Sequence, residues 1–213
     1  MSTNKTVYVV IGPPGCGKGT RVQLLIEWFM NNFMKILYRI TMSDELRLVK
    51  KTNRRWYDEY IGRFIDSLRL VPFESVVRVF DPVFRRAMDA GLDIIVDGFP
   101  RDIDQAQHLV ALAKKYPDYR FVVVIIHVDL GDCRERMIFR RRPGETPEGI
   151  DGRLEEWVQF GVPTNEYLAG SKLKVLHVPG GSTPQEGLQN ILQATGLLEK
   201  RERPRNRETA YSY

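Results

Sequence analysis

Short apolar runs recur along the chain, separated by longer stretches in which apolar residues follow a helical period. Runs of β-branched, aliphatic and aromatic residues with few polar interruptions are typical of strands that are buried on both faces. These runs occupy residues 7–11, 35–39, 93–97, 121–128 and 174–178. The sequence therefore predicts a strand in each run, and their continuous apolar character favours a parallel sheet.

The stretches between these runs predict helices. They lie at residues 18–32, 73–90, 103–116, 131–141, 149–160 and 183–195. Strands that alternate with helices are expected in an α/β fold, in which the helices cover both faces of a parallel sheet. No internal repeat is visible in the sequence.

Two segments break this alternation. Residues 41–71 contain many charges and the cluster RRWYDEY but no strand candidate, which predicts a small helical insert. The segment RRPGETPEGIDG, residues 141–152, is rich in proline and glycine and is too short to hold a core of its own. Such a segment predicts a mobile loop.

The overall composition is that of a soluble globular protein, with 43% hydrophobic and 28% charged residues in a chain of 213. This length suffices for one large domain. The longest aliphatic or aromatic run, residues 121–126, is too short to cross a bilayer. The two cysteines, Cys16 and Cys133, are too few for a disulfide scaffold and favour a reducing compartment. No signal-peptide pattern precedes the first glycines, so we expect a cytoplasmic protein with no membrane partner.

The basic charge is concentrated at the C-terminus. The net charge is +5, and the last fourteen residues, KRERPRNRETAYSY, contain five basic and two acidic side chains. A basic tail can bind nucleic acid or another acidic surface, although most such tails are only solvated. We therefore expect one domain over residues 1–199 and a disordered tail over 200–213, which is the only segment expected to contact nucleic acid.

The run GPPGCGKGT, residues 12–20, follows the first predicted strand and opens the first predicted helix. Glycines allow several backbone N–H groups to point inward, and the helix directs its positive dipole end at the same place. Lys18 can then reach the outer phosphates of a nucleotide. A glycine-rich turn would need neither the lysine nor the hydroxyl of Thr20, so the sequence predicts a phosphate-binding loop.

A second motif, DGFPR, follows the third predicted strand at residues 97–101. A carboxylate at the C-terminal end of a parallel strand lies beside the phosphate-binding loop. Asp97 can there hold the water shell of a nucleotide-bound Mg²⁺. Arg101 offers a planar fork for phosphate oxygens, and Gln105 follows four residues later.

Together the two motifs resemble those of the adenylate kinase family of nucleoside monophosphate kinases. The resemblance rests on GPPGCGKGT, in which Gly19 separates Lys18 from Thr20, and on DGFPR with Gln105 downstream. The resemblance covers the chain from Val7 to about Leu192. It implies a P-loop NTPase fold, with a five-stranded parallel sheet and helices on both faces. It also implies that residues 1–40, 72–140 and 154–199 form the core, that residues 41–71 form a helical acceptor-binding insert, and that residues 141–153 form a short lid.

The same resemblance assigns site residues. ATP would be bound by the P-loop and by the helix that enters the lid, through Gly12, Pro13, Gly15, Cys16, Gly17, Lys18, Gly19, Thr20, Arg136 and Arg140. AMP would be bound by the insert, the second motif and the lid, through Thr41, Met42, Arg47, Leu70, Val71, Gly98, Arg101, Gln105, Arg142 and Arg153. The charges around the transferring group would be Lys18, Arg101, Arg140, Arg142 and Arg153, with Asp97 holding Mg²⁺ through water.

The implied function is reversible, Mg²⁺-dependent transfer of a phosphoryl group from ATP to a nucleoside monophosphate by a monomeric enzyme. AMP is the favoured acceptor, because the amide of Gln105 can both donate to and accept from the edge of adenine. Met42 and Ser43 stand where the family usually has a small residue and a glycine, which leaves a UMP or CMP kinase as an alternative. A nucleotide-binding regulatory protein without transfer activity is a further alternative.

Overall fold

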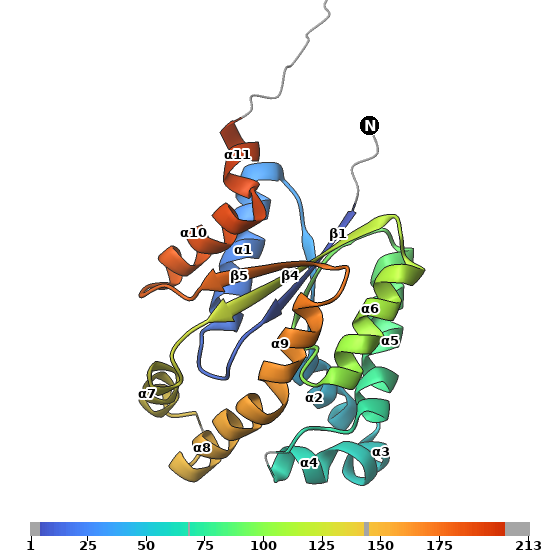
Figure 1. Ribbon diagram of the computed structural model, residues 1–213. Coiled ribbons are helices and arrows are strands. Elements are labelled where there is room, and N and C mark those ends of the chain that lie inside the picture. Colours follow the sequence, from blue (N-terminus) through green and yellow to red (C-terminus); the bar gives the residue numbers. More distant parts are fainter. Residues whose placement is uncertain (1–4, 68, 143–144, 203–213) are drawn as a thin grey trace, which may run out of the picture.

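The computed structural model describes residues 5–67, 69–142 and 145–202, apart from the side chains of 200–202. Residues 143–144 of the predicted lid, residue 68 of the predicted insert and residues 203–213 of the predicted tail lie outside the described residues. The strands form one parallel sheet in the order β2-β3-β1-β4-β5 (Figure 1). The strands are β1 (Lys5–Ile11), β2 (Leu37–Thr41), β3 (Asp93–Asp97), β4 (Tyr119–His127) and β5 (Lys174–Pro179).

Helices form the crossovers between successive strands, and further helices follow the last strand, β5. The helices are α1 (Lys18–Phe33), α2 (Met42–Thr52), α3 (Arg54–Tyr57), α4 (Arg63–Asp66), α5 (Phe73–Asp89), α6 (Ile103–Lys115), α7 (Leu130–Arg140), α8 (Pro147–Glu156), α9 (Val162–Ala169), α10 (Pro184–Thr195) and α11 (Leu197–Glu202). Two π-helical turns, η1 (Asp58–Gly62) and η2 (Trp157–Gly161), join short helices into longer helical segments. The predicted α/β fold with a five-stranded parallel sheet is confirmed.

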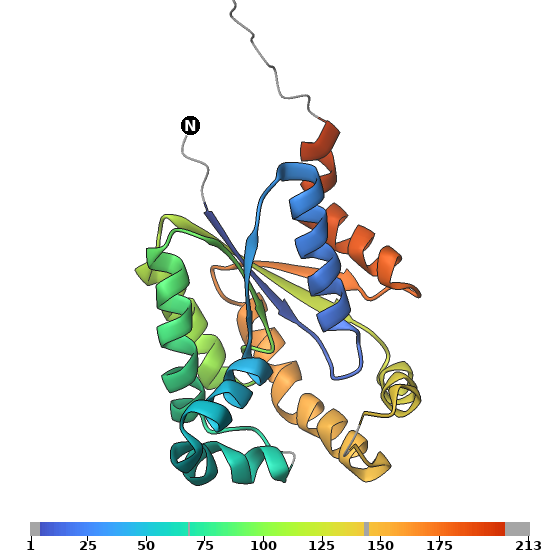
Figure 2. The ribbon, with the colours of Figure 1, turned by 180° about the vertical axis from the view of Figure 1, so that it is seen from behind.

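Helices cover both faces of the sheet, as Figures 1 and 2 show from opposite sides. Successive residues of the central strand β1 point to opposite faces. Val9 packs in a core cluster with Phe80 of α5, and Val10 packs in a second cluster with Leu25 of α1. All four of these side chains are at most 1% exposed. The sheet is therefore buried on both sides, which is why its strands have continuous apolar sequences.

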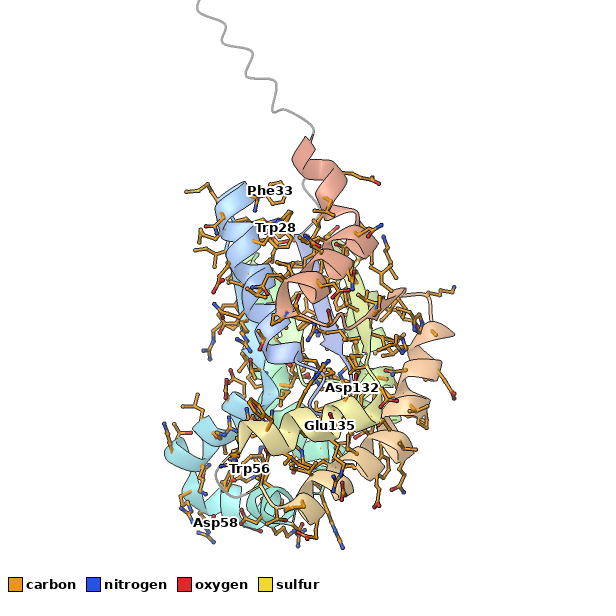
Figure 3. All side chains as sticks on the ribbon, turned by 90° about the vertical axis from the view of Figure 1, so that its left-hand side faces the viewer. Trp28, Phe33, Trp56, Asp58, Asp132 and Glu135 are labelled. Carbon is orange, nitrogen blue, oxygen red and sulfur yellow. The ribbon has the colours of Figure 1, made fainter. Side chains whose placement is uncertain are left out.

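The C-terminal helix α11 belongs to the folded domain. Trp28 and Phe33, near the end of α1, pack edge to face with ring centroids 5.3 Å apart (Figure 3). Leu197 of α11 is buried in the same core cluster. Leu197 thus anchors the helix, which runs to Glu202, past the predicted domain boundary at residue 199.

The segment between β2 and α5 is helical, as predicted. It consists of α2, α3, η1 and α4, and it lies beyond the carboxyl ends of the strands (Figure 1). Tyr57 and Ile61 anchor it, because both are buried in the same core cluster as residues of α5. The helices α7 and α8 lie at the same end of the sheet, on the side away from α3 and α4 (Figure 1).

Several element boundaries differ from the prediction; β1 begins at Lys5 rather than at residue 7, and β4 begins at Tyr119 rather than at residue 121. β2 begins at Leu37 rather than at residue 35, because Lys35 is a surface residue that pairs with Asp93 and Ile36 is 68% exposed. The helix predicted at 149–160 begins at Pro147, where Thr146 caps its N-terminus, and continues through η2 into α9. The π-helical turn shifts the hydrogen-bond register just before Pro163, so the continuation was missed from the sequence. Along the described ranges, no helix combines the length and apolar character needed to span a membrane.

Candidate active site

The P-loop is a tight turn between β1 and α1. Gly15 and Gly17 have φ values of +84° and +82°, which non-glycine residues rarely adopt. The Cys16 N–H donates to the Pro13 carbonyl at 3.2 Å, which closes the turn. A Cβ atom at Gly15 would collide with the backbone carbonyl oxygen of Cys133 in α7. The loop therefore requires glycine here both for its backbone angles and for its close contact with α7.

Lys18 is the first residue of α1, and its side chain folds back over the loop. Its Nζ donates to the carbonyl oxygens of Gly12 at 2.6 Å and Pro13 at 2.9 Å. These neutral partners hold the ammonium group at the mouth of the loop without cancelling its charge. A bound phosphate can therefore replace them as a stronger, charged acceptor.

A cavity of about 540 Å³ opens at the carboxyl ends of the strands, between the P-loop, the insert and the helices α7 and α8. This is the position in which open α/β sheets bind ligands. The predicted site residues that line it are Gly12, Gly15, Gly17, Lys18, Gly19, Thr20, Thr41, Arg47, Leu70, Asp97, Gly98, Arg101, Arg136, Arg140, Arg142 and Arg153. The fold thus brings together residues that lie far apart in the sequence.

Arginines from the helices α7 and α8 converge on this cavity. Glu145 accepts hydrogen bonds from Arg140 at 2.7 Å and from Arg153, and its side chain is only 11% exposed. Burial lowers the pKa of Arg153, and the neighbouring guanidinium groups of Arg101, Arg140 and Arg142 lower it further, while Glu145 opposes them. So many cations in one cavity repel one another unless an anion joins them, which favours a ligand with several phosphates.

Arg101 is presented by a rigid turn after β3. Phe99 is fully buried and stacks on Phe80 of α5, with ring centroids 4.1 Å apart. The Arg101 Nε donates to the Gly98 carbonyl at 3.1 Å. The turn therefore fixes the backbone of Arg101 while its guanidinium lines the cavity.

Asp97 is the last residue of β3. Its carboxylate lines the same cavity as Thr20 of α1, which carries a hydroxyl group. Both are hard oxygen donors of the kind that Mg²⁺ prefers. Among the described residues, no group of three or more His, Cys, Asp or Glu side chains could hold a metal ion by itself. The donor set therefore fits an ion that is held mainly by nucleotide phosphates and water, with one carboxylate from the protein.

Comparison with known proteins identifies the family. The family model for adenylate kinase matches residues 10–172. An adenylate kinase from Nautilia profundicola is 33% identical over 198 residues, which cover 92% of this chain and 87% of that protein. The chain belongs to the adenylate kinase family. An adenylate kinase 1 from Nostoc sp. is 30% identical over 190 residues, 89% of this chain and 98% of that protein. An adenylate kinase from Bacteroides fragilis is 29% identical over 194 residues, with the same coverage.

Membership of the adenylate kinase family confirms the predicted P-loop NTPase fold and makes the protein a phosphotransferase of the nucleoside monophosphate kinase type. The match begins at residue 10, just before the P-loop, and includes the helical segment between β2 and α5 and the helices α7 and α8.

Some predicted site residues do not line the cavity. They are Pro13, Cys16, Met42, Val71 and Gln105. Met42, the first residue of α2, is 2% exposed and packs in the core, whereas the next residue, Ser43, lines the cavity. Gln105 is 1% exposed, and its amide accepts from the Arg101 N–H at 3.0 Å and donates to Asp102 at 2.6 Å. The amide keeps one N–H and one lone pair for a further partner.

The two cysteines are free and buried at the back of the P-loop. Burial raises the pKa of Cys133 to about 12, so its thiol stays protonated and unreactive.

Several residues of the site were not predicted from the sequence. Glu156 also lines the cavity; burial raises the pKa of its carboxyl group, while the charge of Arg101 lowers it. Glu156 follows Arg153 by three residues and therefore lies on the same face of the helix. This spacing could have identified Glu156 as a site residue from the sequence. Trp157 also lines the cavity, but it begins the π-helical turn η2, which no simple helical period predicts.

Arg21 and Arg39 were also missed. Arg21 is 4% exposed and donates to the Cys16 carbonyl at 2.6 Å and to the Gly180 carbonyl. It therefore ties the P-loop to the loop that follows β5. Arg39 lines the cavity and donates to Asp97 at 3.1 Å. The predicted β2 ended at this residue, so its side chain could not be assigned to the site.

Proposed function

We propose that the protein transfers the terminal phosphoryl group of ATP reversibly to AMP, forming two molecules of ADP. The observation that carries this proposal is the position of the cations. Lys18 begins the P-loop helix α1, Arg101 follows β3 and Arg153 lies on α8, and all three line one continuous cavity. A protein that only bound a nucleotide would not need positive charge on both sides of the point of transfer.

The chemistry requires no protein nucleophile. The acceptor phosphate is already an anion at neutral pH, so catalysis consists of holding the two nucleotides in line and neutralising charge on the transferring group. Lys18 would bind the outer donor phosphates in exchange for the carbonyls of Gly12 and Pro13. Arg140 and Arg153 would exchange Glu145 for phosphate oxygens in the same way. When bound, Mg²⁺ neutralises charge on the donor phosphates, and Asp97 would hold it through its water shell.

The insert of residues 41–71 would bind the acceptor, and the lid of residues 141–153 would close over the phosphates. Closure would exclude water, which otherwise competes with AMP for the phosphoryl group. We further propose that the enzyme acts as a monomer in the cytoplasm, which its two free cysteines fit.

AMP is the proposed acceptor because of Gln105. A side-chain amide offers both a donor and an acceptor, which match the N6 and N1 positions of adenine. Reading the base would require the amide to turn from its buried position toward the cavity. A pyrimidine acceptor remains the second candidate, because Ser43 rather than the family's glycine lines this part of the cavity.

The test is kcat/KM for AMP, CMP, UMP and GMP with ATP as donor. We expect AMP to be preferred. In Gln105→Ala the value for AMP should fall about 5- to 150-fold, which corresponds to roughly 1–3 kcal/mol for one lost buried hydrogen-bond partner. Gln107→Ala is the matched control, because Gln107 lies on the same helix and is exposed. If the wild type prefers UMP or CMP, the proposal that AMP is the acceptor is wrong. If the preference for AMP survives in Gln105→Ala, Gln105 does not recognise the base.

A further inference from the structure

Arg39 makes an ion pair inside the nucleotide cavity that the transfer mechanism above does not use. Its Nη2 donates to the Asp97 Oδ2 at 3.1 Å, and its Nε donates to the Thr41 hydroxyl at 2.9 Å. The Nη1 lies 3.5 Å from the Gln23 side-chain oxygen. The Arg39 side chain is 32% exposed and that of Asp97 is 11% exposed, so the pair is partly shielded from water.

The fold places this pair beside the donor phosphates. Arg39 and Asp97 come from the neighbouring parallel strands β2 and β3, near their carboxyl ends. A Cβ atom at Gly19, in the first turn of α1, would lie 3.7 Å from the Arg39 Nη2 and 3.8 Å from the Asp97 Oδ2. The guanidinium therefore lies over the start of the P-loop helix, next to the carboxylate that is expected to hold the metal ion.

We propose that Arg39 is a positioning residue that competes with Mg²⁺ for the Asp97 carboxylate. This inference rests on the proposed function, in which ATP binds here with Mg²⁺. Without the ion, Arg39 holds the carboxylate in place and supplies positive charge near the donor phosphates. With the ion, Arg39 must release or share Asp97, and two cations lie close together in a cavity of reduced dielectric constant.

The consequence is a coupling between Arg39 and the metal ion. Arg39 strengthens the binding of nucleotide without Mg²⁺ and weakens the binding of Mg²⁺ to the enzyme–nucleotide complex. One quantity reports both effects: the Kd for nucleotide measured without Mg²⁺ divided by the Kd measured with Mg²⁺. By the thermodynamic cycle, this Kd ratio equals the factor by which enzyme-bound nucleotide holds the ion more tightly than free nucleotide does. Removal of the Arg39 charge should therefore raise this ratio.

A purely structural role for Arg39 predicts something different. Its bonds to Thr41 and Asp97 could serve only to join the ends of β2 and β3. Loss of such a role would lower thermal stability and weaken nucleotide binding equally with and without Mg²⁺. The Kd ratio separates the two roles, since it changes only if Arg39 and the ion act on the same site.

The experiment is isothermal titration calorimetry with the β,γ-imido analogue of ATP, in EDTA and in excess Mg²⁺. The variants are Arg39→Gln, Arg39→Lys and the control Arg85→Gln, whose arginine is exposed on α5 outside the cavity. We expect the Kd ratio to rise about tenfold in Arg39→Gln, within the usual range of coupling between two sites. It should rise by about two- to threefold in Arg39→Lys, which keeps the charge but loses the planar fork, and stay unchanged in Arg85→Gln.

A Kd ratio that is the same in the wild type and both Arg39 variants overturns the inference while leaving the proposed function intact. If Arg39→Gln does not fold, Arg39→Lys decides by the same criterion. A wild-type protein that binds the analogue in neither condition overturns the proposed function, and this inference with it.

Discussion

Lys18→Ala is expected to lower kcat/KM for phosphoryl transfer by a factor on the order of 10³, the size of effect seen when one preorganised charge is removed from a closed phosphoryl-transfer site. The Lys18 ammonium donates to the carbonyls of Gly12 and Pro13 and lies 3.7 Å from the Cys16 sulfur, and it forms no ion pair among the described residues, so the fold should be retained. The measurement is steady-state kinetics with ATP and AMP, together with thermal melting followed by circular dichroism.

Lys172→Ala is the matched control, because Lys172 is exposed and lies outside the cavity. Its kinetics should equal those of the wild type. A Lys18→Ala protein that melts normally and keeps a tenth of wild-type activity would contradict the role assigned to this lysine.

Gly15→Ala is expected to lower the affinity for ATP by about 100-fold, although only one methyl group is added. Its φ of +84° is strained for any residue with a Cβ, by roughly 1–2 kcal/mol. The methyl group would also collide with the Cys133 backbone carbonyl, which cannot move without shifting α7. The P-loop must therefore change shape, and its backbone N–H groups no longer converge on a phosphate.

Gly152→Ala provides the control for this substitution. Gly152 lies within α8, and a Cβ atom there would meet no atom within 4 Å. Alanine at an exposed position inside a helix is more stable than glycine by up to about 1 kcal/mol, so this variant should melt at a higher temperature and bind ATP normally. Calorimetric ATP affinities within threefold of each other for Gly15→Ala and the wild type would show that the loop tolerates a side chain here.

The parts of the molecule that could be predicted from the sequence are those that depend on local pattern. The strands are recognisable because both of their faces are buried, as Val9 and Val10 illustrate. The P-loop is recognisable because its function requires glycines and a lysine at fixed spacing between a strand and a helix. The family motif then places Arg101 and Asp97 on the same cavity, and the geometry agrees.

The parts that could not be predicted depend on pairing between side chains that are distant in the sequence. Arg39 and Asp97 are 58 positions apart, and only the register of β2 against β3 brings them together. Gln105 was expected to face the acceptor, but its amide is engaged by Arg101 and Asp102 at the start of α6. Which of several possible hydrogen bonds a side chain makes depends on the packing around it, and packing is not visible in a local pattern.

Residues 141–152 show the same limit. Glycine and proline in residues 141–152 indicated a loop, and α8 nevertheless begins at Pro147. The reason is local but easily overlooked, because Thr146 accepts the Gly149 N–H at 3.1 Å and proline is favoured in the first turn of a helix. The helix then presents Arg153 and Glu156 to the cavity.

The central claim is that the protein transfers a phosphoryl group from ATP to AMP. The most direct test uses ATP labelled with ³²P in its γ-phosphate and follows the label into the products. The purified protein is incubated with labelled ATP, AMP and Mg²⁺, and the nucleotides are separated by chromatography. We expect the label to appear in the β-phosphate of ADP, with two ADP formed for each AMP consumed and no label in inorganic phosphate beyond the background. Label that appears in inorganic phosphate, or that enters UMP or CMP faster than AMP when these acceptors compete, would contradict the account.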